Sequence, residues 1–338
     1  MKTVEDLERK LAQPSPALVE DMARLEGDIL VLGVGGKMGP SLAKLAKNAI
    51  VAAGGKQKVI GAARFSTKSL VDELEQAGVE TIVCDVTSES DLAALPEVPN
   101  VIFMVGMKFG TTGNEHLTWL MNSYVPGRVA ERFRRSSIVV FSSGNVYPLT
   151  PVHLGGASEE NEVGPVGEYA QSVLGRERVF TAFSHKYKTP MLLFRLMYAI
   201  DLRYGILLEV AEAVRDGRPI DVTMGNVNVI WQGDANEMAL RSLFHCASPP
   251  RVLNVTGPET ISIRWLAERF GELLGVEPRF SGAEAPTALL GNASNAHRLF
   301  GYPRVTLREM IELVAGWVKA GGPTLGKPTH FQEREGKF

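Results

Sequence analysis

The chain has 338 residues, of which 45% are hydrophobic and 22% charged, a composition that fits an ordinary globular protein with a sizeable core. Its 36 basic and 38 acidic residues give a formal net charge of −2, which speaks against partners such as nucleic acid or an anionic membrane surface. The two distant cysteines, Cys84 and Cys246, lie in apolar surroundings and argue against a disulfide framework. No secretory or membrane-spanning segment is apparent, so we expect a cytoplasmic protein.

Residues 1–27 are predicted to form a helical leader. Val4, Leu7 and Leu11 recur at helical spacing, two prolines interrupt the pattern, and Leu18 then resumes it. We expect the leader to pack on the outside of the first domain.

Apolar strands alternate with helices from Asp28 onward. Strands are expected at 29–32, 59–62, 81–84, 101–105, 138–141 and 191–195, and helices at 41–49, 67–77, 115–133 and 169–184. Strands that are apolar almost throughout and alternate with helices indicate a parallel sheet covered on both faces. The predicted fold class is therefore α/β, with a Rossmann-like doubly wound parallel sheet over residues 28–198.

The rhythm changes after residue 198. Helices are expected at 207–215, 231–243, 263–274 and 307–319, and short strands at 220–222 and 251–255. We predict a smaller α/β substrate domain built from 199–226 and 258–325, with 227–257 returning to the Rossmann domain. The polar tail, 326–338, is expected to be disordered, and the alternative is that it folds over the substrate cleft.

A glycine-rich turn follows the first strand. In ILVLGVGGKMG, Gly33, Gly36 and Gly39 are spaced as GxxGxxG, and a helix follows at once. A side chain in this turn would block the approach of the backbone to a pyrophosphate, whose charge the first N–H groups of the helix can bind. Because the motif follows the first strand of an α/β repeat, we predict a dinucleotide site here that includes Lys37 and Met38.

The second strand bears on the choice of dinucleotide. NAD-binding versions of this fold usually end the strand with an acidic residue that binds the ribose hydroxyls, whereas KVIGAARFS places Arg64 near that position. An arginine suits a 2′-phosphate, so NADP is favoured and NAD stays possible. The alternative is that Arg64 is a solvated surface residue.

Several later segments resemble the NAD-dependent epimerase/dehydratase family, the extended short-chain dehydrogenases, in the order of that family. FSSGNVY (141–147) places Ser143 at the catalytic serine, and GEYAQS (167–172) places Tyr169 at the catalytic tyrosine. CDVT (84–87), FRLMYAI, VIWQGDAN, VLNVTGPE and NASNAHRLFGYP resemble further landmarks. The resemblance implies a tyrosinate that moves the proton of a substrate hydroxyl, a serine that holds the same oxygen, and hydride exchange with a nicotinamide. It also implies cofactor contacts from Asp85, Val86, Val105, Gly106 and Met107.

One departure from the family concerns a catalytic cation. The family has lysine four residues after the tyrosine, on the same face of the helix, and this chain has Val173. Lys108 directly follows the fourth strand, at the edge where the nicotinamide is expected. We predict that Lys108 supplies positive charge beside Tyr169; the plain alternative is a solvated loop lysine.

Further departures concern the substrate. Tyr198 and Val227 replace an asparagine and an arginine that are usual in sugar-nucleotide enzymes of the family, which argues against a nucleoside-diphosphate sugar. A smaller sugar, polyol or sugar acid fits better. Possible pocket residues, each of which could equally be a packing residue, are Asn145, Tyr147, Tyr198, Arg203 and Trp231. The six histidines show no metal-ligand spacing, so no metal site is expected.

Two classes of function fit these patterns. The first is an NAD(P)-dependent dehydrogenase, reductase or epimerase that acts on a carbohydrate-like substrate. The second is a dinucleotide-binding sensor or complex subunit without turnover, which Val173 favours. The family resemblance further implies a homodimer or higher homo-oligomer that associates through the helices predicted at 115–133 and 169–184.

Overall fold

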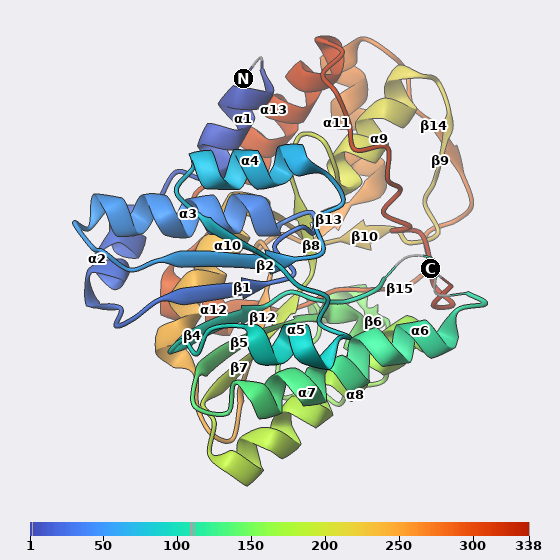
Figure 1. The fold of residues 1–338 in the computed structure, drawn as a ribbon. Coiled ribbons are helices and arrows are strands. Elements are labelled where there is room, and N and C mark those ends of the chain that lie inside the picture. Colours follow the sequence, from blue (N-terminus) through green and yellow to red (C-terminus); the bar gives the residue numbers. More distant parts are fainter. Residues whose placement is uncertain (2, 109, 111, 338) are drawn as a thin grey trace.

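The computed structural model describes residues 1, 3–108, 110 and 112–337, and its centre is a seven-stranded parallel sheet (Figure 1). The strand order is β12-β7-β5-β4-β1-β2-β3. The strands are β1 (Ile29–Leu32), β2 (Val59–Ala63), β3 (Glu80–Val83), β4 (Asn100–Phe103), β5 (Ser137–Ser143), β7 (Met191–Leu196) and β12 (Arg251–Val255). The six strands predicted up to residue 195 are all present in the sheet, and the predicted Rossmann-like class is confirmed.

Successive residues of β1 face opposite sides of the sheet, and both sides are buried. Ile29 and Val31 belong to one apolar cluster, while Leu30 and Leu32 belong to another. The first cluster contains side chains of α2 (Pro16–Arg24), α3 (Gly39–Ala52), α4 (Lys68–Gln76), α10 (Gln232–Arg241) and α12 (Ser294–Phe300). The second contains side chains of α5 (Glu89–Ala94), α7 (Val125–Arg132) and α8 (Gly167–Tyr187). Helices on both faces explain why the inner strands are apolar at most positions.

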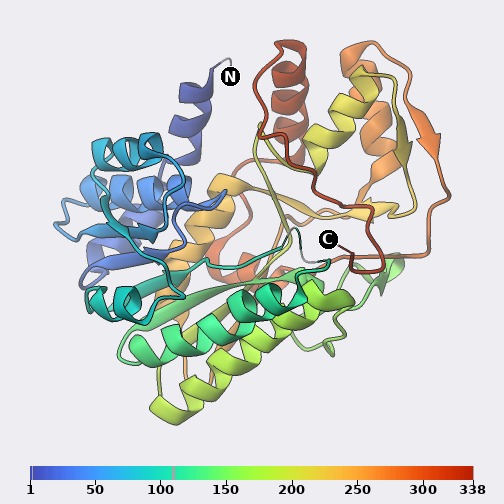
Figure 2. The same ribbon diagram turned by 45° about the vertical axis from the view of Figure 1, so that its right-hand side comes forward.

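A second core lies beside the carboxyl edge of the sheet, in the smaller domain (Figure 2). Its helices are α9 (Ile206–Arg215), α11 (Ile263–Leu274) and α13 (Leu307–Lys319). Its short strands pair as β8 (Tyr198–Ile200) with β11 (Val229–Trp231), β9 (Pro219–Asp221) with β14 (Arg279–Ser281), and β10 (Asn226–Val227) with β13 (Ile261–Ser262). A further pair, β6 (Thr150–Pro151) with β15 (Thr287–Ala288), joins the two parts of the chain.

The leader does not simply cover the first domain, as the sequence suggested. Leu7 and Leu11 of α1 (Val4–Leu11) are fully buried in the core of the smaller domain, whereas Leu18 of α2 lies in the sheet core. Glu8 of α1 forms ion pairs with Lys44 of α3 and with Arg203, and these contacts add to the connection between the two domains. The leader therefore ties the two cores together.

The helix expected over 115–133 is divided. It consists of α6 (Glu115–Trp119), a π-helical turn (Leu120–Tyr124) and α7. Pro126 has no N–H group, so it cannot donate to the carbonyl of Asn122 four residues earlier, and the widened turn carries Asn122 inward, where it is fully buried. Such turns are frequent at functional sites.

Residues 326–337 of the C-terminal tail pack against the rest of the chain, so the expectation that they are disordered was wrong. Thr329 and Phe331 are buried, and the backbone N–H and hydroxyl of Thr329 both donate to the carboxylate of Glu209 on α9. Arg334 donates to the carbonyl and hydroxyl oxygens of Thr287, at 2.7 Å each, and a Cβ on Gly167 would overlap the backbone of Gly336. The tail thus runs from the smaller domain to the start of α8 (Figure 1).

Replacement of Phe331 by alanine should release this tail. The buried ring contributes to the core of the smaller domain, and the tail has few other apolar contacts to keep it in place. We expect faster hydrogen exchange of the amides of residues 327–337 by mass spectrometry, with unchanged exchange in the sheet. Phe244→Ala, at a ring that is 39% exposed, is the matched control. Equal exchange in both variants would contradict an anchoring role for Phe331.

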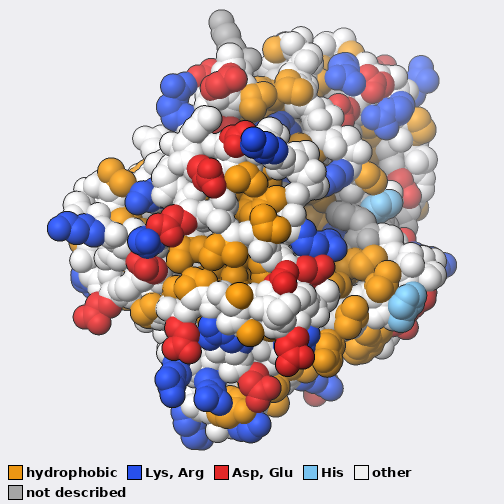
Figure 3. All heavy atoms as spheres, viewed as in Figure 1, with side chains coloured by type: hydrophobic (Ala, Val, Ile, Leu, Met, Phe, Trp, Pro, Cys, Tyr) orange, Lys and Arg blue, Asp and Glu red, His pale blue; other side chains and the backbone are white. Residues whose placement is uncertain are grey.

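The surface carries mixed charge. Basic and acidic side chains alternate over the face shown in Figure 3, as the near-neutral composition suggests. Among the described residues, no helix combines the length and apolar character needed to cross a bilayer.

Candidate active site

The glycine turn opens at the carboxyl end of β1, between its neighbours β2 and β4. Gly33 has φ +86°, a backbone conformation that favours glycine, and its N–H and that of Val34 both donate to Ala62 of β2. A Cβ on Gly39 would overlap the carbonyl of Val34, so the first turn of α3 needs glycine for close packing. Two of the three predicted glycine positions, Gly33 and Gly39, are thus set by the local geometry.

A cavity of about 390 Å³ adjoins this turn. Among the residues that line it are Gly33, Gly36, Arg64, Asp85, Val86, Val105 and Gly106, all predicted cofactor contacts. The cavity runs along the carboxyl edge of the sheet and meets backbone without side chains on the glycine side, which suits a dinucleotide. The residues present therefore fit a nicotinamide dinucleotide.

Other contacts engage three of the predicted cofactor residues, Lys37, Met38 and Met107, which lie outside the lining of this cavity. Lys37 donates to the carbonyl of Ala199 at 3.0 Å, and its Nζ lies 4.5 Å from the ring centroid of Tyr204. Met38 packs against the sheet core, and the backbone of Met107 is bound by Asn122. The contact of Lys37 with Ala199 joins the glycine turn to the smaller domain.

Arg64 is exposed at the rim of the cavity and lies in the field of Asp85. The pKa of Asp85 is lowered, chiefly by hydrogen bonds from Thr87 and further by the positive charge of Arg64. The ionised carboxylate of Asp85 and the guanidinium of Arg64 therefore flank the end of the cavity next to β2.

Ser143, Tyr169 and Lys108 come together at the carboxyl edge of the sheet. Ser143 ends β5, and Tyr169 lies in the first turn of α8. The Nζ of Lys108 lies 6.0 Å from the ring centroid of Tyr169 and 5.9 Å from that of Tyr198. The hydroxyl of Ser143 donates to Oδ1 of Asn145 at 2.9 Å. The structure thus brings three predicted catalytic residues and two predicted pocket residues into one cluster.

The charges in this cluster are strongly affected by burial. Burial raises the pKa of Tyr169, while the positive charge of Arg176 and a hydrogen bond with Ser143 oppose the rise. Burial lowers the pKa of Lys108 to about 8, with a smaller opposing effect from Glu209. Lys108 can therefore change its protonation state near neutral pH, as proton-transfer chemistry requires.

Position 173 supplies no charge to the site. The side chain of Val173 is fully buried in a small apolar cluster with Val146, Tyr147 and Ala157. Two polar residues near Tyr169 were not anticipated from the sequence, Asn122 and Arg176, and both are buried. The sequence did contain a signal for Arg176, because a residue seven positions after Tyr169 lies on the same face of the helix.

Two predicted pocket residues are interior packing residues. The hydroxyl of Tyr147 accepts from Arg195 at 2.6 Å and donates to Asn254 at 2.9 Å, and the side chain is 2% exposed. Trp231 is 1% exposed and packs in the core of the smaller domain. Tyr147 and Trp231 are therefore corrected to structural residues.

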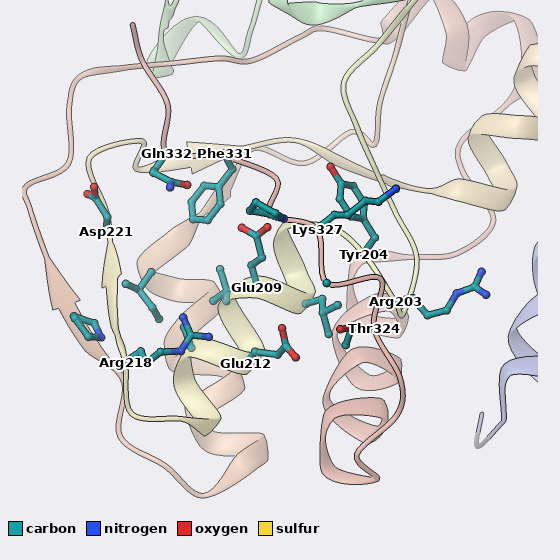
Figure 4. A pocket seen from close by; sticks show the side chains of 18 residues that line it. Arg203, Tyr204, Glu209, Glu212, Arg218, Asp221, Thr324, Lys327, Phe331 and Gln332 are labelled. Carbon is teal, nitrogen blue, oxygen red and sulfur yellow. The ribbon is translucent and has the colours of Figure 1, made fainter. Parts of the chain in front are cut away.

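A second cavity, of about 450 Å³, lies between α9, β9 and the tail (Figure 4). Its lining includes the predicted pocket residue Arg203, together with Tyr204, Glu209 and Lys327. Figure 4 shows the Glu209 carboxylate turned toward the tail, between Phe331 and Lys327. Glu209 also acts on the pKa of Lys108, and burial raises the pKa of Tyr204 to about 12, with smaller contributions from Glu209 and Tyr169. This second cavity is thus electrostatically coupled to the cluster around Tyr169.

Residues 29–200 match the model of the NAD dependent epimerase/dehydratase family. The chain belongs to this family. The match covers the glycine turn, Ser143 and Tyr169, and it confirms the family that the ordered motifs predicted. A comparison with curated proteins gave no match.

Solved structures of several proteins, two of them epimerases, share the fold of this chain. UDP-glucuronic acid 4-epimerase from Bacillus cereus, in complex with NAD, is 17% identical with a TM-score of 0.71 and covers 86% of this chain and 98% of its own. UDP-glucose 4-epimerase from Thermus thermophilus, also in complex with NAD, is 18% identical, with a TM-score of 0.70 and coverage of 86% and 99%. Pal from Bacillus thuringiensis is 17% identical, with a TM-score of 0.71 and coverage of 87% and 99%. At these identities the similarity establishes the fold.

Proposed function

We propose that this chain is an NAD(P)-dependent oxidoreductase or epimerase that acts on a hydroxyl or carbonyl group of a sugar, polyol or sugar acid. The observation that carries the proposal is the cluster of Ser143, Tyr169 and Lys108 beside a glycine-lined cavity at the carboxyl edge of the sheet. In doubly wound folds, ligands bind at this edge, where the strand order reverses.

The residues of the cluster have distinct roles in this proposal. Tyr169 moves the proton of the substrate hydroxyl, and Ser143 holds the same oxygen through its own hydroxyl. Lys108, beside the tyrosine ring, adds positive charge that favours the phenolate. A bound nicotinamide supplies the hydride acceptor or donor. A net oxidation consumes added cofactor, whereas an epimerisation retains it.

The cofactor is held by the glycine turn and the cavity walls. Backbone N–H groups at the start of α3 bind the pyrophosphate, and Asp85 and Val86 border the adenine. Arg64, exposed at the rim, binds a 2′-phosphate, so NADP is the proposed cofactor. The family's name and the solved neighbours refer to NAD, which is therefore the competing cofactor in the experiment below.

The proposed substrate lacks a nucleotide. Tyr198 and Val227 stand where sugar-nucleotide enzymes of the family usually have an asparagine and an arginine, and Val227 is fully buried, so it offers no polar group to a phosphate. Two solved neighbours are UDP-sugar epimerases, and UDP-sugars therefore belong in the same substrate screen as free sugars and sugar acids.

A non-catalytic sensor or complex subunit is the second candidate. It is favoured by the apolar side chain of Val173, which cannot provide the cation that the family places there. A protein of this kind would bind the dinucleotide and leave every substrate unchanged.

Titration of the purified protein with NADPH and NADH, followed by nicotinamide fluorescence, tests the cofactor site. We expect tighter binding of NADPH, and about a tenfold weaker affinity for NADPH in Arg64→Ala, because a charge-assisted contact to phosphate contributes about 1.5 kcal/mol or more. The NADH affinity of the same variant is the internal control and should not change. Tighter binding of NADH would contradict the role of Arg64, and binding of neither would overturn the proposed function.

A further inference from the structure

Arg176 is a buried cation on the helix of Tyr169. It follows Tyr169 by seven residues, about two turns, and is 6% exposed. Long side chains on a helix lean toward its N-terminus, which directs the guanidinium toward the tyrosine. Nη2 lies 2.5 Å from the position of a Cβ on Gly106, a residue that lines the dinucleotide cavity. The guanidinium therefore reaches the wall of that cavity.

The guanidinium is held by neutral oxygens. Nη1 donates to the carbonyl of Phe141 at 2.8 Å, and Nη2 donates to Oδ1 of Asn122 at 2.7 Å. Nε points to the carbonyl of Asn122, the one that Pro126 leaves without a helical donor, at 3.5 Å. Within the described residues, none of the ion pairs includes Arg176, and the adjacent Glu177 is engaged by Arg195.

A buried charge without a counter-ion is costly, and structural sites normally avoid it. The neutral oxygens keep the guanidinium solvated by dipoles, and they leave its charge available to an anion that forms during a reaction. Tyr169 can become such an anion, and the charge of Arg176 already opposes the effect of burial on its pKa. Burial lowers the pKa of Arg176 itself to about 10, so the group stays charged at neutral pH.

The same asparagine fixes the surrounding backbone. Asn122 accepts from the N–H of Met107 at 2.9 Å and donates to its carbonyl at 2.8 Å, beside Lys108. It also donates to the hydroxyl of Ser172 at 2.9 Å, which donates in turn to the carbonyl of Tyr169. The guanidinium is therefore fixed relative to both catalytic segments, and a fixed charge needs little reorganisation when the phenolate forms.

We propose that Arg176 is a positioning residue that supplies, from the next turn of α8, the fixed positive charge that Val173 does not provide. The proposal rests on the role of Tyr169 in the proposed function. A guanidinium stays protonated, so Arg176 favours the phenolate through its field and does not carry the proton. Lys108 and Arg176 thus provide, from two positions, the positive charge near Tyr169 that a single lysine provides in the family.

Ionisation of a fluorinated tyrosine tests this proposal without substrate or cofactor. Difluorotyrosine at position 169 titrates at lower pH than tyrosine, and the change of its fluorine resonance along a pH titration gives the pKa of this one side chain. We compare the otherwise unaltered protein with Arg176→Met and Arg176→Lys, and with Arg178→Met as the control, an exposed arginine of the same helix. Thermal unfolding of each variant is recorded separately.

The pKa of the label should rise by about one unit or more in Arg176→Met, a tenfold loss of phenolate at a given pH. It should stay close to the parent value in Arg176→Lys, which keeps the charge but loses the forked hydrogen bonds, and in Arg178→Met. An unchanged pKa in a folded Arg176→Met would overturn the proposal. If that variant does not fold, a pKa in Arg176→Lys raised by a unit would overturn it equally. Dinucleotide binding by the parent protein reports on the proposed function independently.

Discussion

Replacement of Tyr169 by phenylalanine should reduce turnover by about 10²- to 10⁴-fold, the usual contribution of a general acid or base. The change removes one hydroxyl and keeps the ring, so the apolar contacts of the first turn of α8 persist. Because the hydroxyl acts on the substrate, the dissociation constant for the dinucleotide should stay within about twofold, a difference of less than 0.5 kcal/mol. Steady-state rates and nicotinamide fluorescence measure the two quantities.

Tyr187→Phe is the matched control for this variant. Tyr187 ends the same helix, and its hydroxyl donates to Glu131 at 3.0 Å, an exposed contact remote from the cavity. It should leave both turnover and affinity unchanged. Full activity in Tyr169→Phe would remove the tyrosine from the mechanism. A parent protein that binds the dinucleotide yet turns over none of the screened substrates would favour the sensor.

The sheet could be predicted because the burial of its inner strands is visible in their apolar sequences. Strands buried on both faces are apolar almost throughout, and residues 29–32 and 191–194 show this directly in the sequence. The leader was harder to place, because Leu7 and Leu11 show a buried helix face without showing which core buries it. The tail was misjudged for a related reason, since a polar composition does not reveal that Thr329 and Arg334 find partners on α9 and β15.

The glycine turn was predictable because its requirement is local: Gly33 and Gly39 are fixed by backbone conformation and close packing within a few residues. The substrate pocket depends instead on contacts between distant segments. Tyr147 is drawn inward by Arg195, which is 48 residues away in the chain. Arg176 carried a positional signal through its spacing from Tyr169, but only its contacts with Asn122 and Phe141 show that neutral oxygens hold its buried guanidinium.

Replacement of Glu177 by alanine should lower the free energy of unfolding by about 3–5 kcal/mol, the cost of leaving a buried charge without its partner. Arg195 donates from Nε and Nη2 to the two carboxylate oxygens, at 2.9 and 2.7 Å, and both side chains are at most 7% exposed. Ser142 donates to the same carboxylate at 2.5 Å. Urea denaturation followed by circular dichroism measures the loss.

Glu312→Ala provides the comparison, because Glu312 pairs with Arg308 on the surface of α13, where the two side chains are 50% and 86% exposed. Exposed pairs contribute about 0.2–1 kcal/mol, so this variant should remain close to the parent. Similar losses in the two variants would show that the Glu177–Arg195 pair is no more stabilising than a surface pair. A large loss confined to Glu177→Ala would instead mean that the buried carboxylate holds β7 and the end of β5 to α8, the helix of Tyr169, through Arg195 and Ser142.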